Sequence, residues 1–253
     1  MTTNAGNTSS TKVRIVSKPS RKTWCDIYES NIYANCENMY TELNSHQMKN
    51  SEWGAAVYLA YSQYGRNGNE ISVNECVSLY TGGGKARNTT AAYSWFYNYD
   101  ASTFESTYAW NTTRGVQSSS TGNIYGIYDL SGCSYERVAS YVQSSGENFL
   151  KHSQTLVDSS TLRNKQIYPA SFSSSVYGDA VYETSKGTSS WETWNEDLAA
   201  YPTTSSPSFA RGEFAVDMEE AGQFAYRTDD GDTSSKGFSF RPVLCVSNTV
   251  ATK

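Results

Sequence analysis

One glycine-punctuated stretch decides the fold of this chain: Thr121-Gly122-Asn123-Ile124-Tyr125-Gly126-Ile127-Tyr128-Asp129-Leu130-Ser131-Gly132. Its apolar side chains alternate around the glycines, which predicts a strand or a tight connection buried under the core. Directly after it, the apolar residues Tyr135, Val138 and Tyr141-Val142 predict a second strand. The middle of the chain therefore predicts β-structure.

Two amphipathic helices are predicted before this stretch. The first spans about residues 24–43, because one helical face carries Tyr28, Ile32, Cys36, Met39 and Leu43. The second begins near Asn50 and ends at Gly65, and its apolar face consists of Trp53, Ala56, Val57, Ala60 and Tyr64. Two early helices followed by short strands are typical of an α+β domain.

The remaining residues predict short strands between turns. Alternating side chains predict strands at 12–16, 180–183 and 238–244, whereas the polar residues 143–175 predict a long surface excursion. Glycines punctuate the region between the last two strands: Gly212, Gly222, Gly231 and Gly237. Because no repeat or interdomain linker is evident, we predict a single α+β domain over residues 13–247, with mobile tails at 1–12 and 248–253.

The composition excludes several classes of protein. The 253 residues carry 20 Lys and Arg against 25 Asp and Glu, and this net charge of −5 argues against binding to a nucleic-acid backbone. No apolar run approaches the roughly 18 residues of a membrane span, and the polar N-terminus has no signal peptide. The 20 tyrosines, among many Ser, Thr, Asn and Gly residues, fit either an adaptable recognition surface or a β-rich extracellular protein.

The five cysteines form no CxxC pair, which argues against a zinc finger or a thioredoxin-like protein. Cys36 lies on the predicted helical face and is expected in the core, and a Cys36–Cys76 disulfide is left open. The two histidines, His46 and His152, give little support to a His-rich metal site or a Ser-His-Asp triad.

Several phrases, in this order along the chain, resemble a family of bacterial and phage proteins. They are Ser51-Glu52-Trp53-Gly54-Ala55-Ala56, the stretch at 121–132, Gly178-Asp179-Ala180-Val181-Tyr182-Glu183, Ala210-Arg211-Gly212 with Ala221-Gly222-Gln223-Phe224-Ala225-Tyr226, and Ser239-Phe240-Arg241-Pro242-Val243-Leu244. The chain is similar to C-type-lectin-fold proteins related to formylglycine-generating enzymes. More narrowly, it resembles the variable ligand-binding targets of diversity-generating retroelements. The resemblance covers roughly residues 15–246.

This resemblance implies a fold with two helices, a small twisted antiparallel sheet and long loops, which displays a variable segment near its C-terminus. Carried onto this chain, the display segment is residues 209–237. The residues expected to contact a ligand are Phe214, Val216, Asp217, Met218, Glu219, Glu220, Tyr226, Arg227, Thr228, Asp229, Asp230, Asp232, Ser234, Ser235 and Lys236. Phe214 and Tyr226 are the expected apolar anchors; core packing is the alternative for Tyr226 and is favoured for Phe224.

Some residues depart from the pattern of retroelement targets. Diversification in that family acts on adenines, typically in Asn codons, which cannot become Glu, Lys or Met codons. The residues that do not fit are Glu213, Met218, Glu219, Glu220 and Lys236. The chain is therefore either an actively varied target or a fixed relative of such targets.

The sequence does not predict an enzyme. The related formylglycine-generating enzymes bind copper with a close pair of cysteines, whereas Cys245 stands alone near this C-terminus. Glu219 and Glu220 would point to opposite faces of a strand and make a poor glycosidase pair. No cofactor is expected, except that the resemblance leaves open a structural calcium at Glu136. The alternatives for Glu136 are a buried carboxylate or a local pair with Arg137.

A second calcium candidate is Asp229-Asp230-Gly231-Asp232, for which an acidic solvated turn is the favoured interpretation. The resemblance thus implies a non-enzymatic ligand-binding protein of the receptor or adhesin type. Its expected partner is a protein or glycan on a cell surface, with no nucleic acid and no membrane insertion, and its expected location is a bacterial surface, the medium or a phage particle. The alternatives are a structural pilus or tail subunit and a metal-dependent enzyme of the formylglycine-generating type.

Overall fold

A computed structural model describes residues 15–76, 79–83, 108–143, 147–170, 176–186, 191–215, 220–231 and 237–245. The chain is a mixed α+β protein, as predicted. Its helices and strands are α1 (Glu29–Glu37), β1 (His46–Gln47), α2 (Asn50–Tyr61), β2 (Tyr135–Val142), α3 (Glu147–Asp158), β3 (Gln166–Tyr168), β4 (Ser208–Arg211), β5 (Tyr226–Asp229), β6 (Phe238–Phe240) and β7 (Pro242–Val243). None of the helices described is long and apolar enough to cross a membrane.

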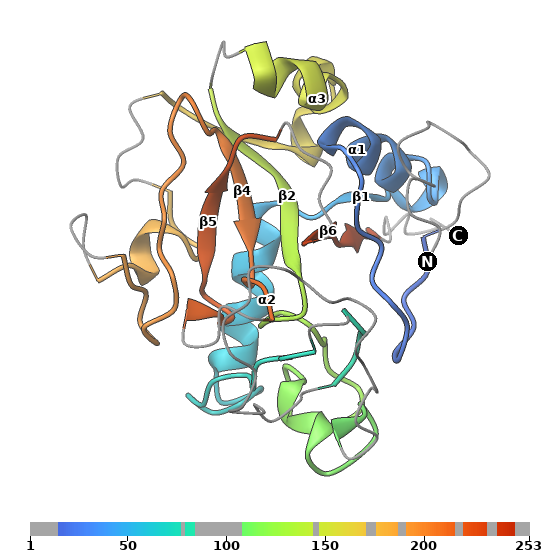
Figure 1. Ribbon diagram of the computed structural model, residues 1–253, viewed down its shortest axis with the longest axis vertical. Coiled ribbons are helices and arrows are strands. Elements are labelled where there is room, and N and C mark those ends of the chain that lie inside the picture. Colours follow the sequence, from blue (N-terminus) through green and yellow to red (C-terminus); the bar gives the residue numbers. More distant parts are fainter. Residues whose placement is uncertain are drawn as a thin grey trace, which may run out of the picture.

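Strand β2 is the centre of the main sheet (Figure 1). On one edge it pairs antiparallel with β4, which in turn pairs antiparallel with β5. On the other edge two short strands pair with it in parallel, β6 along residues 135–137 and β3 along residues 140–142. Glu136 of β2 therefore lies opposite Arg211 of β4 on one side and Ser239 of β6 on the other. Strands β1 and β7 form a separate small antiparallel sheet.

Successive side chains of a strand point to opposite faces, so the sheet has two different surfaces. The α2 face carries Val138, Val142, Phe209, Arg211 and Tyr226, most of which pack in one core cluster with Trp53 and Val57 of α2. The Arg137 face carries Tyr135, Arg137, Ala139, Tyr141, Arg227 and Asp229. Helices α1 and α3 cover one end of this second face through Tyr33, Phe149 and Leu156, and Figure 1 shows both helices at that end.

The predicted helices are present but shorter than the apolar pattern indicates. Asp26 has a left-handed backbone (φ 66°), which prevents a helix from starting at residue 24, and α1 ends at Glu37. Cys36 is buried on α1, as predicted. Helix α2 begins at Asn50, where the Glu52 carboxylate accepts the backbone N–H of Lys49 at 2.9 Å. It ends at Tyr61, so Tyr64 lies outside it and is 78% exposed rather than on the core face.

The β predictions are confirmed at some places and wrong at others. Strand 135–142 is confirmed, and 238–244 is a pair of short strands separated by Arg241. Residues 121–132 form the tight connection that was the alternative to a strand, because Gly122 and Asp129 have positive φ. The prediction that this stretch is buried under the core is wrong for its first half, where Ile124, Tyr125 and Ile127 are exposed, and holds for Leu130. The strand at 180–183 is wrong, since Tyr182–Thr184 is a 3-10 turn. Residues 143–175 are not simply a surface excursion, because they contain α3 and β3.

Part of the predicted strand at 12–16 and both predicted tails, 1–12 and 248–253, lie outside the described residues; Ile15 and Val16, which are described, are not in a strand.

Candidate functional site

The display segment begins on β4 and then turns sharply inward. Gly212 (φ 77°) and Glu213 (φ 57°) both have left-handed backbones. The Gly212 carbonyl accepts the Gly132 N–H at 2.8 Å, and the Ala215 N–H donates to the Cys133 carbonyl at 3.3 Å. This course carries Phe214 into a buried cluster with Cys25, Leu79 and Cys133. The prediction of Phe214 as an exposed anchor is therefore wrong.

Two further predicted contact residues are buried. Tyr226 lies on the α2 face, and its hydroxyl lies 2.6 Å from that of Ser185. Asp229 is buried because it forms an ion pair with Arg137 at 2.7 Å. The prediction that both contact a ligand is wrong, since their side chains stabilise the sheet. Phe224 lies in the core, as predicted.

The other predicted contact residues fall into two groups. Glu220 is exposed, and Arg227, Thr228 and Asp230 are half-buried. The remaining positions lie outside the described residues, so their role stays a prediction: Val216, Asp217, Met218, Glu219, Asp232, Ser234, Ser235 and Lys236.

We term the half-buried side chains of Tyr135, Arg227 and Phe238 the Tyr135–Arg227 patch; all three lie on the Arg137 face. The guanidinium of Arg227 lies 4.5 Å from the centroid of the Tyr135 ring, and its Nη1 lies 3.6 Å from Oε2 of buried Glu213. The Tyr135 ring also packs on Phe238 (4.9 Å) and on Phe214 (5.5 Å). The patch thus presents a partly exposed planar cation fixed against an aromatic ring, which suits polar and aromatic ligand groups.

A buried ion network lies beside this patch on the same face. Arg137 Nε lies 2.7 Å from Asp229 Oδ2 and 4.0 Å from Glu29 Oε2, and its Nη1 donates to the Ile27 carbonyl at 3.3 Å. Gln47 donates to Glu29 Oε1 at 2.8 Å. Burial raises the pKa of Glu29 to about 7, while Arg137 and Gln47 oppose the rise. The network ties β5 to β2 and to α1 under the patch.

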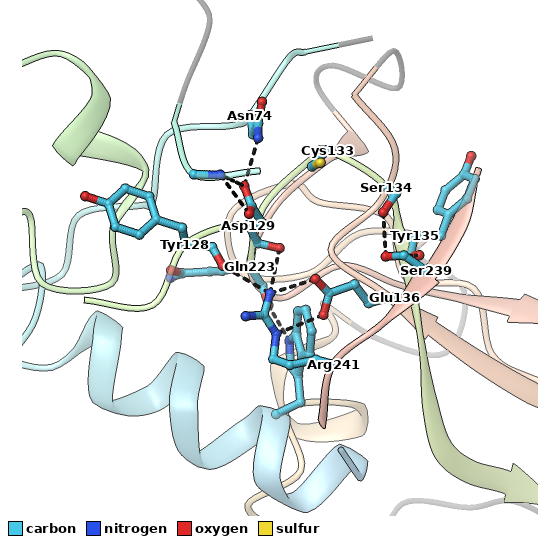
Figure 2. Close-up of polar contacts among 12 residues, drawn as sticks. Asn74, Tyr128, Asp129, Cys133, Ser134, Tyr135, Glu136, Gln223, Ser239 and Arg241 are labelled. Carbon is cyan, nitrogen blue, oxygen red and sulfur yellow. Dashed lines mark hydrogen bonds and ion pairs between the residues drawn. The ribbon is translucent and has the colours of Figure 1, made fainter. Parts of the chain in front are cut away.

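A second polar network fixes the connection that enters β2 (Figure 2). Arg241 donates from Nε and Nη2 to the two carboxylate oxygens of Glu136 at 2.9 and 2.6 Å. Its Nη2 also donates to the backbone carbonyl of Tyr128 at 3.0 Å. Asp129 accepts hydrogen bonds from the Asn74 amide at 2.8 Å and from the Gly82 backbone N–H at 3.0 Å. These contacts hold the residues that lead into Tyr135.

Glu136 does not fit the calcium site that the resemblance implies. Both of its oxygens already accept hydrogen bonds from Arg241, so the alternative of a buried, hydrogen-bonded carboxylate is confirmed. The other alternative, a local pair with Arg137, is wrong because Arg137 points to the opposite face. Burial raises the pKa of Glu136, against the effect of Arg241. Within the described ranges, no group of three or more His, Cys, Asp or Glu side chains could hold a metal ion.

All five cysteines are free thiols, so the Cys36–Cys76 disulfide is not formed. Burial raises the pKa of Cys25 to about 12 and raises the pKa of Cys133 well above its usual value. A buried protonated thiol is a poor nucleophile and a poor metal ligand. Cys245 is exposed, and we assign it no role.

The sequence does not predict the Tyr135–Arg227 patch, because its pattern identifies Tyr135 and Phe238 only as strand residues. Strand pairing brings Tyr135 opposite Phe238, and it brings Arg227 to the same face from two strands away. The alternation of side chains along a strand predicts which face of its own strand Tyr135 or Arg227 occupies. It does not predict that the two residues lie close together, because that depends on strand order and register.

Comparison of the sequence with models of known protein families gives no match, and comparison with curated proteins gives none either.

Proposed function

We propose that this chain is a non-enzymatic ligand-binding protein of the receptor or adhesin type, in which a C-type-lectin scaffold presents a binding surface near its C-terminus. The observation that carries the proposal is the Tyr135–Arg227 patch. There, a guanidinium and two aromatic rings are held at the sheet surface by buried groups, and rigidly placed aromatic and arginine side chains dominate the energetics of recognition.

The chain connectivity supports the same location. Residues 216–219 begin two positions after Phe214, and residues 232–236 end two positions before Phe238. Both of these aromatic residues contact the Tyr135 ring. We therefore propose that Val216 and Lys236, each two positions from one of these aromatic residues, contribute to the same ligand surface. The ligand surface would then combine the fixed patch with variable residues at its margin.

We further propose that the ligand is a protein or glycan on a cell surface, and that the chain acts at a bacterial surface or on a phage particle as a target of a diversity-generating retroelement. A reverse transcriptase gene next to an adenine-biased near-copy of the coding region for residues 209–244 would support the diversification. A genome with neither feature would favour a fixed relative.

A glycan and protein array, probed with the wild-type chain and with variants, tests the binding function. We expect Tyr135→Ala and Glu219→Ala to lose array signals that the wild type gives. Tyr64→Ala is the matched control, because Tyr64 is an exposed tyrosine beyond the end of α2 and should leave the signals unchanged. Binding that survives Tyr135→Ala, Arg227→Gln and every substitution in residues 209–237 would contradict the proposal.

A further inference from the structure

A second surface stands out in residues 191–199, where two tryptophans are exposed to solvent. Trp191 is 69% exposed and Trp194 is 46% exposed. Backbone hydrogen bonds define this region: Thr193 N–H donates to the Asp197 carbonyl, and Ala199 N–H donates to the Trp191 carbonyl, both at 2.8 Å. Large exposed aromatic side chains on an ordered backbone mark interaction sites more often than chance.

The Trp194 ring is fixed by other aromatic side chains. Its centroid lies 5.4 Å from that of Phe224 in an edge-to-face arrangement and 6.0 Å from that of Tyr58. The Tyr58 hydroxyl in turn donates to Glu183 Oε1 at 2.7 Å. Because Trp194 is held by these contacts, a ligand that stacks on it loses little side-chain freedom on binding.

Two exposed glutamates lie in the same short segment as the two tryptophans and share one lysine. Lys186 Nζ lies 3.1 Å from Glu192 Oε2 and 3.4 Å from Glu196 Oε1, and these two glutamate side chains are 52% and 79% exposed. The carbonyl of Glu220, another exposed glutamate, accepts the Leu198 N–H at 2.9 Å. Among the described residues of this region, the two carboxylates of Glu192 and Glu196 thus share a single ammonium group, and the exposed Glu220 is joined to the same segment through its backbone.

We infer that Trp191, Trp194, Glu192, Glu196 and Glu220 form a docking surface for an arginine- or lysine-rich segment of a partner protein. A guanidinium can stack on an indole face, the best aromatic partner for a cation, while it donates hydrogen bonds to a neighbouring carboxylate. A neutral glycan could also stack on an indole, but it would gain nothing from the excess negative charge. This surface does not rest on the Tyr135–Arg227 patch.

Titration of the full chain with a labelled peptide of alternating arginine and glycine, against a matched glutamate–glycine peptide, tests this inference. We expect only the arginine peptide to bind, with an affinity that falls as salt is raised. Trp191→Ala should weaken that binding roughly fivefold to tenfold, and Trp191→Tyr should lose less, because tyrosine keeps an aromatic face. The double variant Glu192→Gln with Glu196→Gln should weaken it about threefold and reduce its salt dependence.

Two controls carry the same kinds of change elsewhere. Tyr125→Ala removes an 89% exposed tyrosine, and Glu42→Gln neutralises an exposed glutamate; neither should alter the affinity. Equal binding of both peptides, binding of the arginine peptide that is unaffected by Trp191→Ala, or binding of a neutral oligosaccharide panel in place of the arginine peptide would each overturn the inference.

Discussion

The two faces of the main sheet each bury one arginine, and they hold it in opposite ways. On the α2 face, the guanidinium of Arg211 lies 5.5 Å from the rings of both Trp53 and Tyr226, and its Nη2 donates to the Ala180 carbonyl at 2.8 Å. Burial lowers the pKa of Arg211 to about 10, against the effect of Asp179. On the Arg137 face, Arg137 instead pairs directly with Asp229.

This difference indicates which face is available for recognition. Helix α2 packs against the α2 face, and the polar atoms of Arg211 on that face bind other buried groups. The Arg137 face combines charge with aromatic rings and reaches solvent at the Tyr135–Arg227 patch. The variants below test this difference between the α2 face and the Arg137 face, beginning with the largest expected loss of stability.

Trp53→Ala should cause the largest loss, about 3–5 kcal/mol of unfolding free energy. Trp53 is fully buried against the α2 face, and its Nε1 donates to the Gln223 carbonyl at 3.0 Å. Urea unfolding followed by circular dichroism measures the effect. Leu59→Ala on the same helix is the matched control, because Leu59 is exposed and its loss should change stability by less than about 0.5 kcal/mol. Similar losses for both variants would contradict a core role for this face.

Arg137→Leu should cost about 3 kcal/mol, because it leaves the carboxylates of Glu29 and Asp229 buried without their cation. A triple variant that also replaces Glu29 and Asp229 with leucine should recover most of this loss, since no unpaired charge remains. Thermal and urea unfolding of the wild type, the single variant and the triple variant measure the loss of stability and its recovery. A single variant as stable as the wild type would mean that the ion pair does not hold the Arg137 face together.

The stability conferred by Glu29 should depend on pH. Its folded pKa, raised to about 7 by burial, lies above the ordinary value of 4.5. The folded chain therefore holds a proton that the unfolded chain releases, and this contribution is full below about pH 4.5 and lost as pH rises to about 7. Glu29→Gln cannot ionise, so its stability relative to wild type should rise across that window by roughly 3 kcal/mol. Unfolding curves measured at several pH values, with Glu42→Gln as control, should show this trend for Glu29→Gln alone.

Arg227→Lys should have the smallest effect on stability, below about 1 kcal/mol, since Lys keeps the positive charge near Glu213. It should nevertheless weaken binding of an array ligand severalfold, because an ammonium lacks the planar face that stacks on Tyr135. Titration of that ligand measures the change. Unchanged affinity would place recognition away from the Tyr135–Arg227 patch.

Parts of the fold with a strong local pattern could be predicted from the sequence, and parts shaped by backbone turns could not. The spacing of apolar side chains in residues 135–142 and in α2 predicts the correct strand and helix, because burial of one face makes apolar residues recur at a regular interval. The length of the first helix was overestimated because nothing in an apolar period reveals the left-handed Asp26. Helix α3 was missed, although Phe149, Leu150, Leu156 and Val157 share the spacing of one helical face; surrounding serines and glutamines obscured it.

The candidate site was predicted less well than the fold. The resemblance only implies a display segment at residues 209–237, and the direction of each side chain depends on the turn at Gly212 and Glu213 and on the register of β5. A turn of that kind sends Phe214 inward, and the register sends Tyr226 to the α2 face and Arg227 to the other. Tyr135 lies about a hundred positions before Arg227 and Phe238, so only the strand order brings it next to them.

Arg211, near the start of the display segment, and Ser239, just after its end, lie on opposite edges of β2 at the same residue, because Glu136 is paired with both of them. The polypeptide between them therefore begins and ends two strand spacings apart, roughly 10 Å, and it includes strand β5 and the buried Phe214 and Phe224. Entropy of loop closure grows only logarithmically, by about 0.6 kcal/mol for each doubling of length. This low cost applies to a connecting segment and not to β5 or to the buried Phe214 and Phe224, so any change in length there must leave β5 in register with β4.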